Sequence, residues 1–232
     1  MAGRVLSSAR HNLAMDNKLH AFFWLGDFDN YYLGHQAEEI LKARIYAPYL
    51  ENKPDAVVLD IGGNIGLFSL YAAKYAKQVY TLEPAREHFD CLTRMVDFNG
   101  LTNVKLINKA LFTEDTTLPF FHNRNKTMYS LHTAVQDQSS EPEQVAAISL
   151  PTLFKDENIE HVDLMKLDIE GTELEIISSD GFREVAPKID TIVMELHDWN
   201  GRHPNQAKEA LKAAGFRVST IPNDANILVG VR

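Results

Sequence analysis

The residues best suited to holding a cofactor lie in a glycine-rich turn. Gly62, Gly63 and Gly66 follow the apolar run AVVLDI of residues 56–61 and precede the helix-permissive stretch LFSLYAAKYAK. In an open parallel sheet, ligands bind beyond the carboxyl ends of the strands, and the turn there must approach the ligand through residues without a bulky side chain. We therefore expect this turn to contact a nucleotide-type cofactor.

Two acidic residues beside this turn indicate which cofactor it holds. Asp60 lies at the strand tip, where a pyrophosphate would need amide donors and no neighbouring anion. S-adenosylmethionine (SAM) carries an ammonium and a sulfonium group instead of phosphates, so a carboxylate favours SAM over a dinucleotide. Glu83 ends the next apolar run, QVYTLEP, near the spacing at which an acidic residue accepts hydrogen bonds from ribose hydroxyls. These residues predict a SAM site.

An NAD-linked oxidoreductase is the alternative enzyme class on the same general fold. Its G-x-G-x-x-G fingerprint needs glycine at the positions that Asn64 and Leu67 occupy here. A glycine turn with nearby acids can also be ordinary loop chemistry. The succession of a strand, Asp60, three glycines, a helix and a second strand ending in Glu83 favours a SAM site over both alternatives.

Two short polar arrays could perform chemistry on a bound acceptor. Lys166, Asp168 and Glu170 alternate along an apolar run and its exit, and Glu195 and His197 alternate at the end of the next run. Alternate residues share one face of a strand, and the carboxyl ends of parallel strands form the ligand-binding edge. Methyl transfer from SAM needs an aligned oxygen nucleophile whose proton is removed. We expect both arrays to serve that task.

The catalytic role of these arrays has two interpretations. In the first, His197 is the general base, because its ordinary pKa is nearest to working pH, and Asp168 or Glu195 orients it or the acceptor. In the second, a divalent ion such as Mg²⁺ lowers the pKa of the acceptor hydroxyl. Its ligands would be Asp168, Glu170, Glu195 and His197. The sequence leaves both interpretations open.

Purely structural roles are the alternative for several of the charged residues. Lys166 can pair with Asp168 or Glu170 and so neutralise a buried strand end. Glu173 and Glu175 follow in a helix-like stretch and are expected to face solvent. Neither of these two glutamates is therefore expected to take part in the chemistry.

The composition argues against a polyanionic partner. The chain has 23 Lys and Arg against 32 Asp and Glu, a formal net charge of −9. Nucleic-acid binding usually depends on a basic face that displaces counterions, so DNA and RNA are disfavoured partners. The first twenty residues contain no apolar run long enough for a signal peptide or a membrane span, and the single Cys91 cannot form an internal disulfide. A cytoplasmic protein is expected, and a homo-oligomer is left open.

The elements that position these residues alternate between strands and helices. Strands are expected at 56–61, 78–84, 103–111, 145–150, 162–169 and 189–196. Parallel neighbours need a crossover, which is nearly always helical, so this succession predicts a doubly wound α/β fold with a mainly parallel sheet. At the C-terminal end, FRVSTI and NILVGV are separated by so few residues that we expect an antiparallel pair.

Two segments depart from this regular pattern. Residues 1–50 are interpreted as an N-terminal helical extension, whose aromatic stretch at 22–32 could form a lid over the ligands or pack on the sheet. Residues 119–145 are polar and aperiodic, which is long for a loop, and we interpret them as a substrate-side insertion in the catalytic domain of residues 51–232. Trp199 could stack on an acceptor ring, although filling of the core is expected.

Two segments of the chain resemble the FkbM family of SAM-dependent methyltransferases. They are DIGGNIGLFSL at 60–70 and LMKLDIEGTELEII at 164–177, and the resemblance extends over roughly residues 55–230. It implies a class I methyltransferase sheet of seven strands with a reversed last strand. It also implies an O-methyltransferase whose partner is a small-molecule acceptor, a sugar or natural product with a hydroxyl group. A SAM-binding module without activity is the non-enzymatic alternative.

The same resemblance implies which residues bind SAM. The cofactor would be held by residues of the glycine turn and the second strand, namely Asp60, Gly62, Asn64, Gly66 and Glu83. Asn108, Lys109 and Ala110 would lie along the adenine. Lys109 stands where many class I enzymes have Asp, so main-chain contacts to the adenine are expected there.

Overall fold

The structure is a computed structural model. It describes residues 6–8, 11–16, 21–24, 45–51, 53–122, 129–131, 141–197, 204–221 and 224–232, the first three ranges by their backbone alone. Within this part of the chain, no helix is both long enough and apolar enough to cross a membrane.

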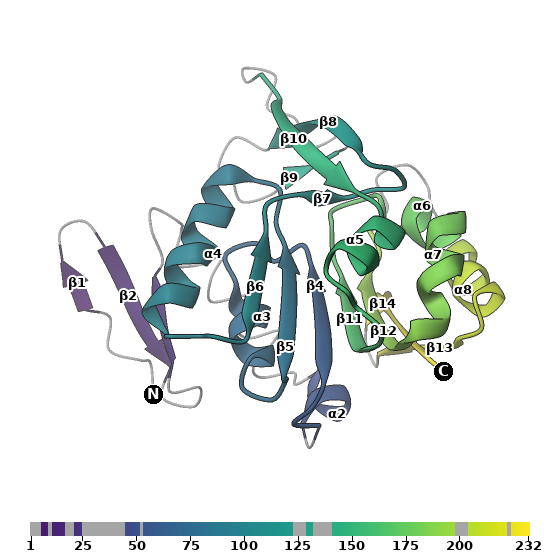
Figure 1. The fold of residues 1–232 in the computed structure, drawn as a ribbon, viewed down its shortest axis with the longest axis horizontal. Helices are drawn as coiled ribbons and strands as arrows, with labels where there is room; N and C mark the ends of the chain where they lie inside the picture. Colours follow the sequence, from purple (N-terminus) through teal and green to yellow (C-terminus); the bar gives the residue numbers. More distant parts are fainter. Residues whose placement is uncertain are drawn as a thin grey trace.

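A seven-stranded sheet forms the centre of the molecule (Figure 1), with the strand order β13-β14-β12-β11-β4-β5-β6. The strands are Val57–Ile61 (β4), Gln78–Leu82 (β5), Val104–Ile107 (β6), Val162–Leu167 (β11), Ile189–Glu195 (β12), Arg217–Ile221 (β13) and Asp224–Val231 (β14). Neighbours from β12 to β6 are parallel, whereas β14 is antiparallel to both β12 and β13. The predicted mainly parallel α/β sheet with a reversed C-terminal strand is confirmed.

Helices cover both faces of this sheet. They are Ala47–Leu50 (α2), Leu67–Ala72 (α3), Arg86–Phe98 (α4), Leu150–Asp156 (α5), Glu173–Ser178 (α6), Asp180–Val185 (α7) and Pro204–Ala213 (α8). Successive strand residues point to opposite faces. Leu59 accordingly packs in the core formed with α5 to α8, and Val58 in the core formed with α2, α3 and α4. The side chain of Cys91 is buried and belongs to the second of these cores.

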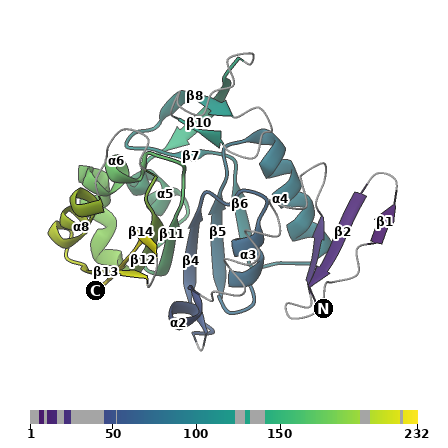
Figure 2. The ribbon, with the colours of Figure 1, turned by 180° about the vertical axis from the view of Figure 1, so that it is seen from behind.

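A second, smaller sheet lies over the carboxyl ends of the central strands (Figures 1 and 2). We call it the satellite sheet, and its strands pair in the order β7-β10-β8-β9. They are Ala110–Leu111 (β7), Thr116–His122 (β8), Tyr129–Ser130 (β9) and Glu143–Ile148 (β10). The strand expected at 145–150 therefore belongs to this sheet and not to the central one. Within the segment 119–145, which was expected to be aperiodic, residues 119–122, 129–130 and 143–145 belong to these strands, and the exposed alternate residues of β8 and β10 made it look polar. Residues 123–128 and 132–140 of the expected insertion lie outside the described residues.

The N-terminal segment differs from the expected helical extension. Its described parts are the strands Leu6–Ser8 (β1), His11–Asp16 (β2) and Ala21–Trp24 (β3), which pair antiparallel. Aromatic residues favour strands, so Phe22, Phe23 and Trp24 fit a strand better than a helix. Of the segment expected to be helical before residue 51, α2 is the described helix. The remainder of the expected lid, residues 25–32, lies outside the described residues.

Candidate functional site

The two sequence segments with the strongest resemblance are in direct contact. Strands β4 and β11 are parallel neighbours, with Asp60 opposite Lys166. The glycine turn therefore lies against the exit of β11. Gly62 has a φ of 84°, and a Cβ placed on it would lie 1.8 Å from the backbone oxygen of Asp168. Only glycine allows this approach, because any side chain here would meet backbone.

Asp60 lies beneath the glycine turn and is shielded from solvent. Its side chain is fully buried, and it accepts a hydrogen bond from the Ser69 hydroxyl, which contacts Thr81 Oγ1 at 2.7 Å. Burial raises the pKa of Asp60, and the neighbouring Lys166 opposes that rise. Asp60 is not among the residues that line the pocket described below, and its direct contact with SAM stays a prediction. Gly66 also faces away from the pocket, against Leu92 of α4.

Lys166 connects the glycine turn to the polar array. Its Nζ donates to Gly62 O at 3.1 Å and lies 3.1 Å from Asp168 Oδ2 and 3.7 Å from Asp60 Oδ1. Burial works to lower the pKa of Lys166, but the carboxylates of Asp168 and Asp60 outweigh it and hold this pKa above its ordinary value. The residue stays a cation and has no lone pair with which to accept a proton. The expected pairing with Asp168 is confirmed, and a catalytic role of Lys166 stays a prediction.

Glu83 forms one side of a pocket that also contains Asn64, His88 and Ala110. Its carboxylate accepts hydrogen bonds from Asn64 N at 2.7 Å and from Ala85 N at 2.9 Å. Burial raises the pKa of Glu83 to about 7, against the effect of these two amides. The buried His88, whose role the sequence did not indicate, has its Nδ1 3.9 Å from Glu83 Oε1.

The residues expected along the adenine separate into two groups. The Asn108 side-chain amide donates to Glu83 O at 2.8 Å and to Pro84 O at 3.0 Å, so it holds the backbone after β5 in place. Lys109 and Ala110 line the pocket, together with Phe120 and Leu131 of the satellite-sheet region. A direct adenine contact stays a prediction for all three residues at 108–110.

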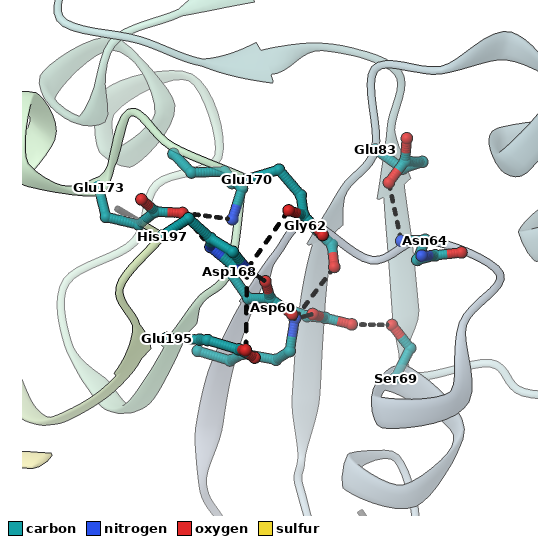
Figure 3. A network of polar contacts seen from close by, with 12 residues as sticks. Asp60, Gly62, Asn64, Ser69, Glu83, Asp168, Glu170, Glu173, Glu195 and His197 are labelled. Carbon is teal, nitrogen blue, oxygen red and sulfur yellow. Dashed lines mark hydrogen bonds and ion pairs between the residues drawn. The ribbon is translucent and has the colours of Figure 1, made fainter. Parts of the chain in front are cut away.

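Four carboxylates surround the imidazole of His197 (Figure 3). Its Nδ1 lies 3.0 Å from Glu173 Oε1, and its Nε2 lies 3.3 Å from Glu170 Oε2, 3.7 Å from Glu195 Oε1 and 4.0 Å from Asp168 Oδ1. We call these five residues the acid–imidazole array. Asp168 and Glu170 also line the pocket that Glu83 borders. The two arrays expected from the sequence are thus brought together.

The charge state of the array limits what His197 can do. Burial works to lower the pKa of His197, but the hydrogen bond with Glu173 and the charge of Glu170 raise it to about 10. At neutral pH both ring nitrogens then carry a proton, and an imidazolium cannot act as a general base. Burial also raises the pKa of Glu170 to about 7.

Glu173 was expected to face solvent, and this prediction is wrong. Its side chain is fully buried, and Oε1 also accepts hydrogen bonds from Ile169 N at 3.2 Å and Gly171 N at 2.9 Å. The chain between them turns sharply, with Glu170 at φ 59° and Gly171 at φ 124°, which brings the first residue of α6 back under the turn. The glycine in the segment DIEGTE of residues 168–173 was the sequence feature that could have indicated this turn. Glu175 is half-buried.

Two groups of described residues have the composition of a metal site. Asp168, Glu170 and His197 offer ligand atoms that lie within 4.8 Å of one another, and Glu195, which was expected among them, borders this group. His161, Asp163 and Asp190 form the second group, beside the amino ends of β11 and β12. Trp199 lies outside the described residues.

Comparison with known proteins gives a match over most of the chain. The family model described as "Methyltransferase FkbM domain" matches residues 60–218. The chain is 28% identical over 185 residues to "Methyltransferase 1" of Beauveria bassiana, a match covering 71% of this chain and 74% of that protein. It is 25% identical over 211 residues to "31-O-demethyl-FK506 methyltransferase FkbM" of Streptomyces tacrolimicus, covering 78% and 80%.

Two further similarities concern a sugar-acid enzyme and a crystal structure. "Hexuronic acid methyltransferase AglP" of Haloferax volcanii is 24% identical over 200 residues, covering 78% of this chain and 73% of that protein. The crystal structure of "Methyltransferase FkbM" from Methylobacillus flagellatus superposes with a TM-score of 0.52 at 14% identity, over 81% of this chain and 46% of that one. At this identity the second similarity shows the fold alone.

Proposed function

This chain belongs to the FkbM methyltransferase family, and from that membership we propose that it transfers the methyl group of SAM to a hydroxyl oxygen of a small molecule, a sugar or a natural product. The observation that carries the proposal is one pocket whose lining offers groups both for a cofactor and for an acceptor. Glu83, suited to a ribose, and the carboxylates of Asp168 and Glu170, suited to a reacting acceptor, both line it.

The names of two relatives support a hydroxyl-bearing acceptor. One acts, by its name, on 31-O-demethyl-FK506 and another on a hexuronic acid. The two names give different acceptors, so they support the class of reaction and not one acceptor. The satellite sheet contributes Phe120 to the pocket wall, and we propose that this sheet helps to select the acceptor.

In the proposed reaction the acceptor oxygen displaces the sulfur of SAM in line, forming one C–O bond and breaking one C–S bond. Glu83 would hold the ribose, and the glycine turn would support the methionine part of the cofactor. The acid–imidazole array would align the acceptor. His197 is held as an imidazolium, so the hydroxyl proton would leave to a carboxylate of the array or to water.

Binding and product formation test this proposal separately. We expect SAM and S-adenosylhomocysteine to bind in calorimetry and to raise the unfolding temperature, and NAD to do neither. Incubation with SAM and a library of sugars and natural products should give a product heavier by one methyl group in place of one hydrogen. Stabilisation by NAD alone would overturn the proposal. SAM binding without any product across the library would point to an inactive SAM-binding module.

We expect the affinity for SAM to fall as the pH is lowered through 7. The pKa of Glu83 is raised to about 7, so below that pH the carboxylate gains a proton and becomes a poorer acceptor for two ribose hydroxyls. The Kd for SAM should rise by up to about tenfold for each pH unit below the pKa. Calorimetry between pH 5.5 and 8 measures this, and Glu83→Gln, which cannot titrate, should bind weakly with little pH dependence. A parallel pH dependence in both proteins would assign the effect to another group.

A further inference from the structure

We propose that Asp168, Glu170 and His197 bind a divalent cation of the Mg²⁺ or Mn²⁺ type, and that Glu173 is the positioning residue that orients the imidazole for it. The binding of the cation depends on these four side chains and not on the proposed reaction. Its task, to bind the acceptor hydroxyl and lower the pKa of that hydroxyl, rests on the proposed function.

The three candidate ligands come from two neighbouring strands and point toward one another (Figure 3). Asp168 and Glu170 follow β11, and His197 follows β12. His197 Nε2 lies 3.3 Å from Glu170 Oε2 and 4.0 Å from Asp168 Oδ1. Mg²⁺ binds its ligands at about 2.1 Å, so two ligand atoms on one ion lie at most roughly 4.2 Å apart. Both measured distances meet this limit.

The environment of His197 is that of a metal ligand. A ligating histidine usually donates its second ring N–H to a carboxylate, which fixes the tautomer and the orientation of the ring. Here Nδ1 lies 3.0 Å from Glu173 Oε1, and Nε2 is directed at Asp168 and Glu170. A cation bound by Nε2 would displace the proton that this nitrogen carries in the imidazolium, while the Nδ1 proton would stay on Glu173. Glu173 is fully buried and is itself held by the amides of Ile169 and Gly171. The orienting carboxylate is therefore rigid.

The charge balance of the array also favours a cation. Four carboxylates, those of Asp168, Glu170, Glu173 and Glu195, lie within 4.0 Å of one imidazole. Against these four carboxylates stand two described cations, the imidazolium of His197 and Lys166, and Lys166 is shared between Asp168 and the buried Asp60. Several partly buried carboxylates with so little positive charge repel one another. An ion with two positive charges would relieve that repulsion.

A second observation, independent of the carboxylates, points to a ligand at this place. Thr172 is 6% exposed and lines the same pocket as Asp168 and Glu170. Its Oγ1 has no hydrogen-bond partner among the described residues, and although Thr172 is the N-cap of α6 its side chain does not cap the helix. Buried polar groups normally have a partner. A water or an acceptor hydroxyl held by the cation would supply one.

The ligand set indicates which ion to test. Carboxylate oxygens prefer hard ions such as Mg²⁺ and Mn²⁺, whereas soft ions are selected by thiolates, which this group lacks. The imidazole nitrogen suits Mn²⁺ better than Mg²⁺. Mn²⁺ is therefore the probe of choice, since its free and bound forms can be told apart by electron paramagnetic resonance.

The experiment titrates the EDTA-treated, dialysed full chain with MnCl₂ and follows free Mn²⁺ by electron paramagnetic resonance. We expect one bound Mn²⁺ per chain, with Mg²⁺ competing for it. Glu170→Gln, which removes one charge from a pocket-lining side chain, should abolish that binding. Glu173→Gln should weaken it by about 10- to 100-fold, as loss of an orienting partner does. Circular dichroism confirms that each variant is folded.

The second acidic group provides a matched control. His161, Asp163 and Asp190 have the same residue types but lie beside the amino ends of the strands, with His161 exposed. His161→Ala should leave Mn²⁺ binding unchanged. Wild-type protein that binds no Mn²⁺, or binding that survives Glu170→Gln and disappears in His161→Ala, would overturn the proposed site.

Calorimetry with SAM on the same samples separates this inference from the proposed function. SAM binding and methyl transfer that persist in EDTA, without Mn²⁺ binding, would overturn the cation site and leave the methyltransferase proposal intact. Mn²⁺ binding without any SAM binding would support the cation site and contradict the proposed reaction.

Discussion

Gly62→Ala is expected to lose SAM binding and to lower the free energy of unfolding by at least about 3 kcal/mol. Two costs add at this position. The backbone is in the left-handed region with a φ of 84°, and the added methyl would lie 1.8 Å from the backbone oxygen of Asp168. Backbone cannot rotate away as a flexible side chain can, so β4 and the exit of β11 must separate. Urea denaturation and calorimetry with SAM measure the two effects.

Gly100→Ala is the matched control for this substitution. Gly100 also has a positive φ, 63°, but a Cβ placed there meets nothing within 4 Å. Its cost should be limited to the left-handed backbone, about 1–2 kcal/mol. An equally small effect of Gly62→Ala would show that the turn can move away from Asp168 without loss, and would contradict the close contact as a requirement of the site.

His197→Ala is expected to lower kcat for methyl transfer by a factor on the order of 10²–10³, the effect of removing one preorganised electrostatic group from an active site. The Kd for SAM should change little, because His197 is not among the residues that line the pocket beside Glu83. Single-turnover kinetics with a confirmed acceptor, together with calorimetry, separate the two quantities. Removal of the imidazole also takes from the fully buried Glu173 its charged partner and leaves it the amides of Ile169 and Gly171, so some loss of stability is expected.

A second variant distinguishes catalysis from stability. His197→Gln keeps a side-chain donor for Glu173 and should recover most of the stability while leaving kcat low. His161→Ala, at the opposite edge of the sheet, should change neither quantity. Turnover at the wild-type level in both variants of His197 would remove this residue from the mechanism.

The parts of the site that depend on local sequence could be predicted. The turn at Gly62 and the acid at Glu83 follow short apolar runs, and such runs identify strand ends without knowledge of the rest of the chain. The alternation of Lys166, Asp168 and Glu170 at the end of a second such run likewise predicted that these residues lie at the ligand-binding edge of the sheet. The direction of each side chain at a strand tip could not be predicted. Asp60 was therefore expected to contact the cofactor, whereas its side chain lies buried beneath the turn.

Glu173 shows a second limit of predicting the site from the sequence. Its position at the start of a short helix makes it look exposed, since two-turn helices have too few residues for a clear apolar face. Its burial depends on His197, which lies 24 residues further along the chain and reaches it only because β11 and β12 are neighbours. Strand β8 of the satellite sheet was missed, and the strand expected at 145–150 was not assigned to a second sheet, because the partners of these strands are distant in sequence.

The satellite sheet begins and ends at one place. Ala110 and Leu111 pair in parallel with Ala147 and Ile148, so the chain returns to the point where it left the central sheet after β6. We expect that a segment closed in this way can be exchanged between relatives as one piece, with the junctions placed at the paired strands β7 and β10. The exchanged segment must still provide a donor such as Ser130 for the carbonyl of Glu170. If this sheet helps to select the acceptor as proposed, chimeras joined at these boundaries are expected to differ in the acceptor that they methylate.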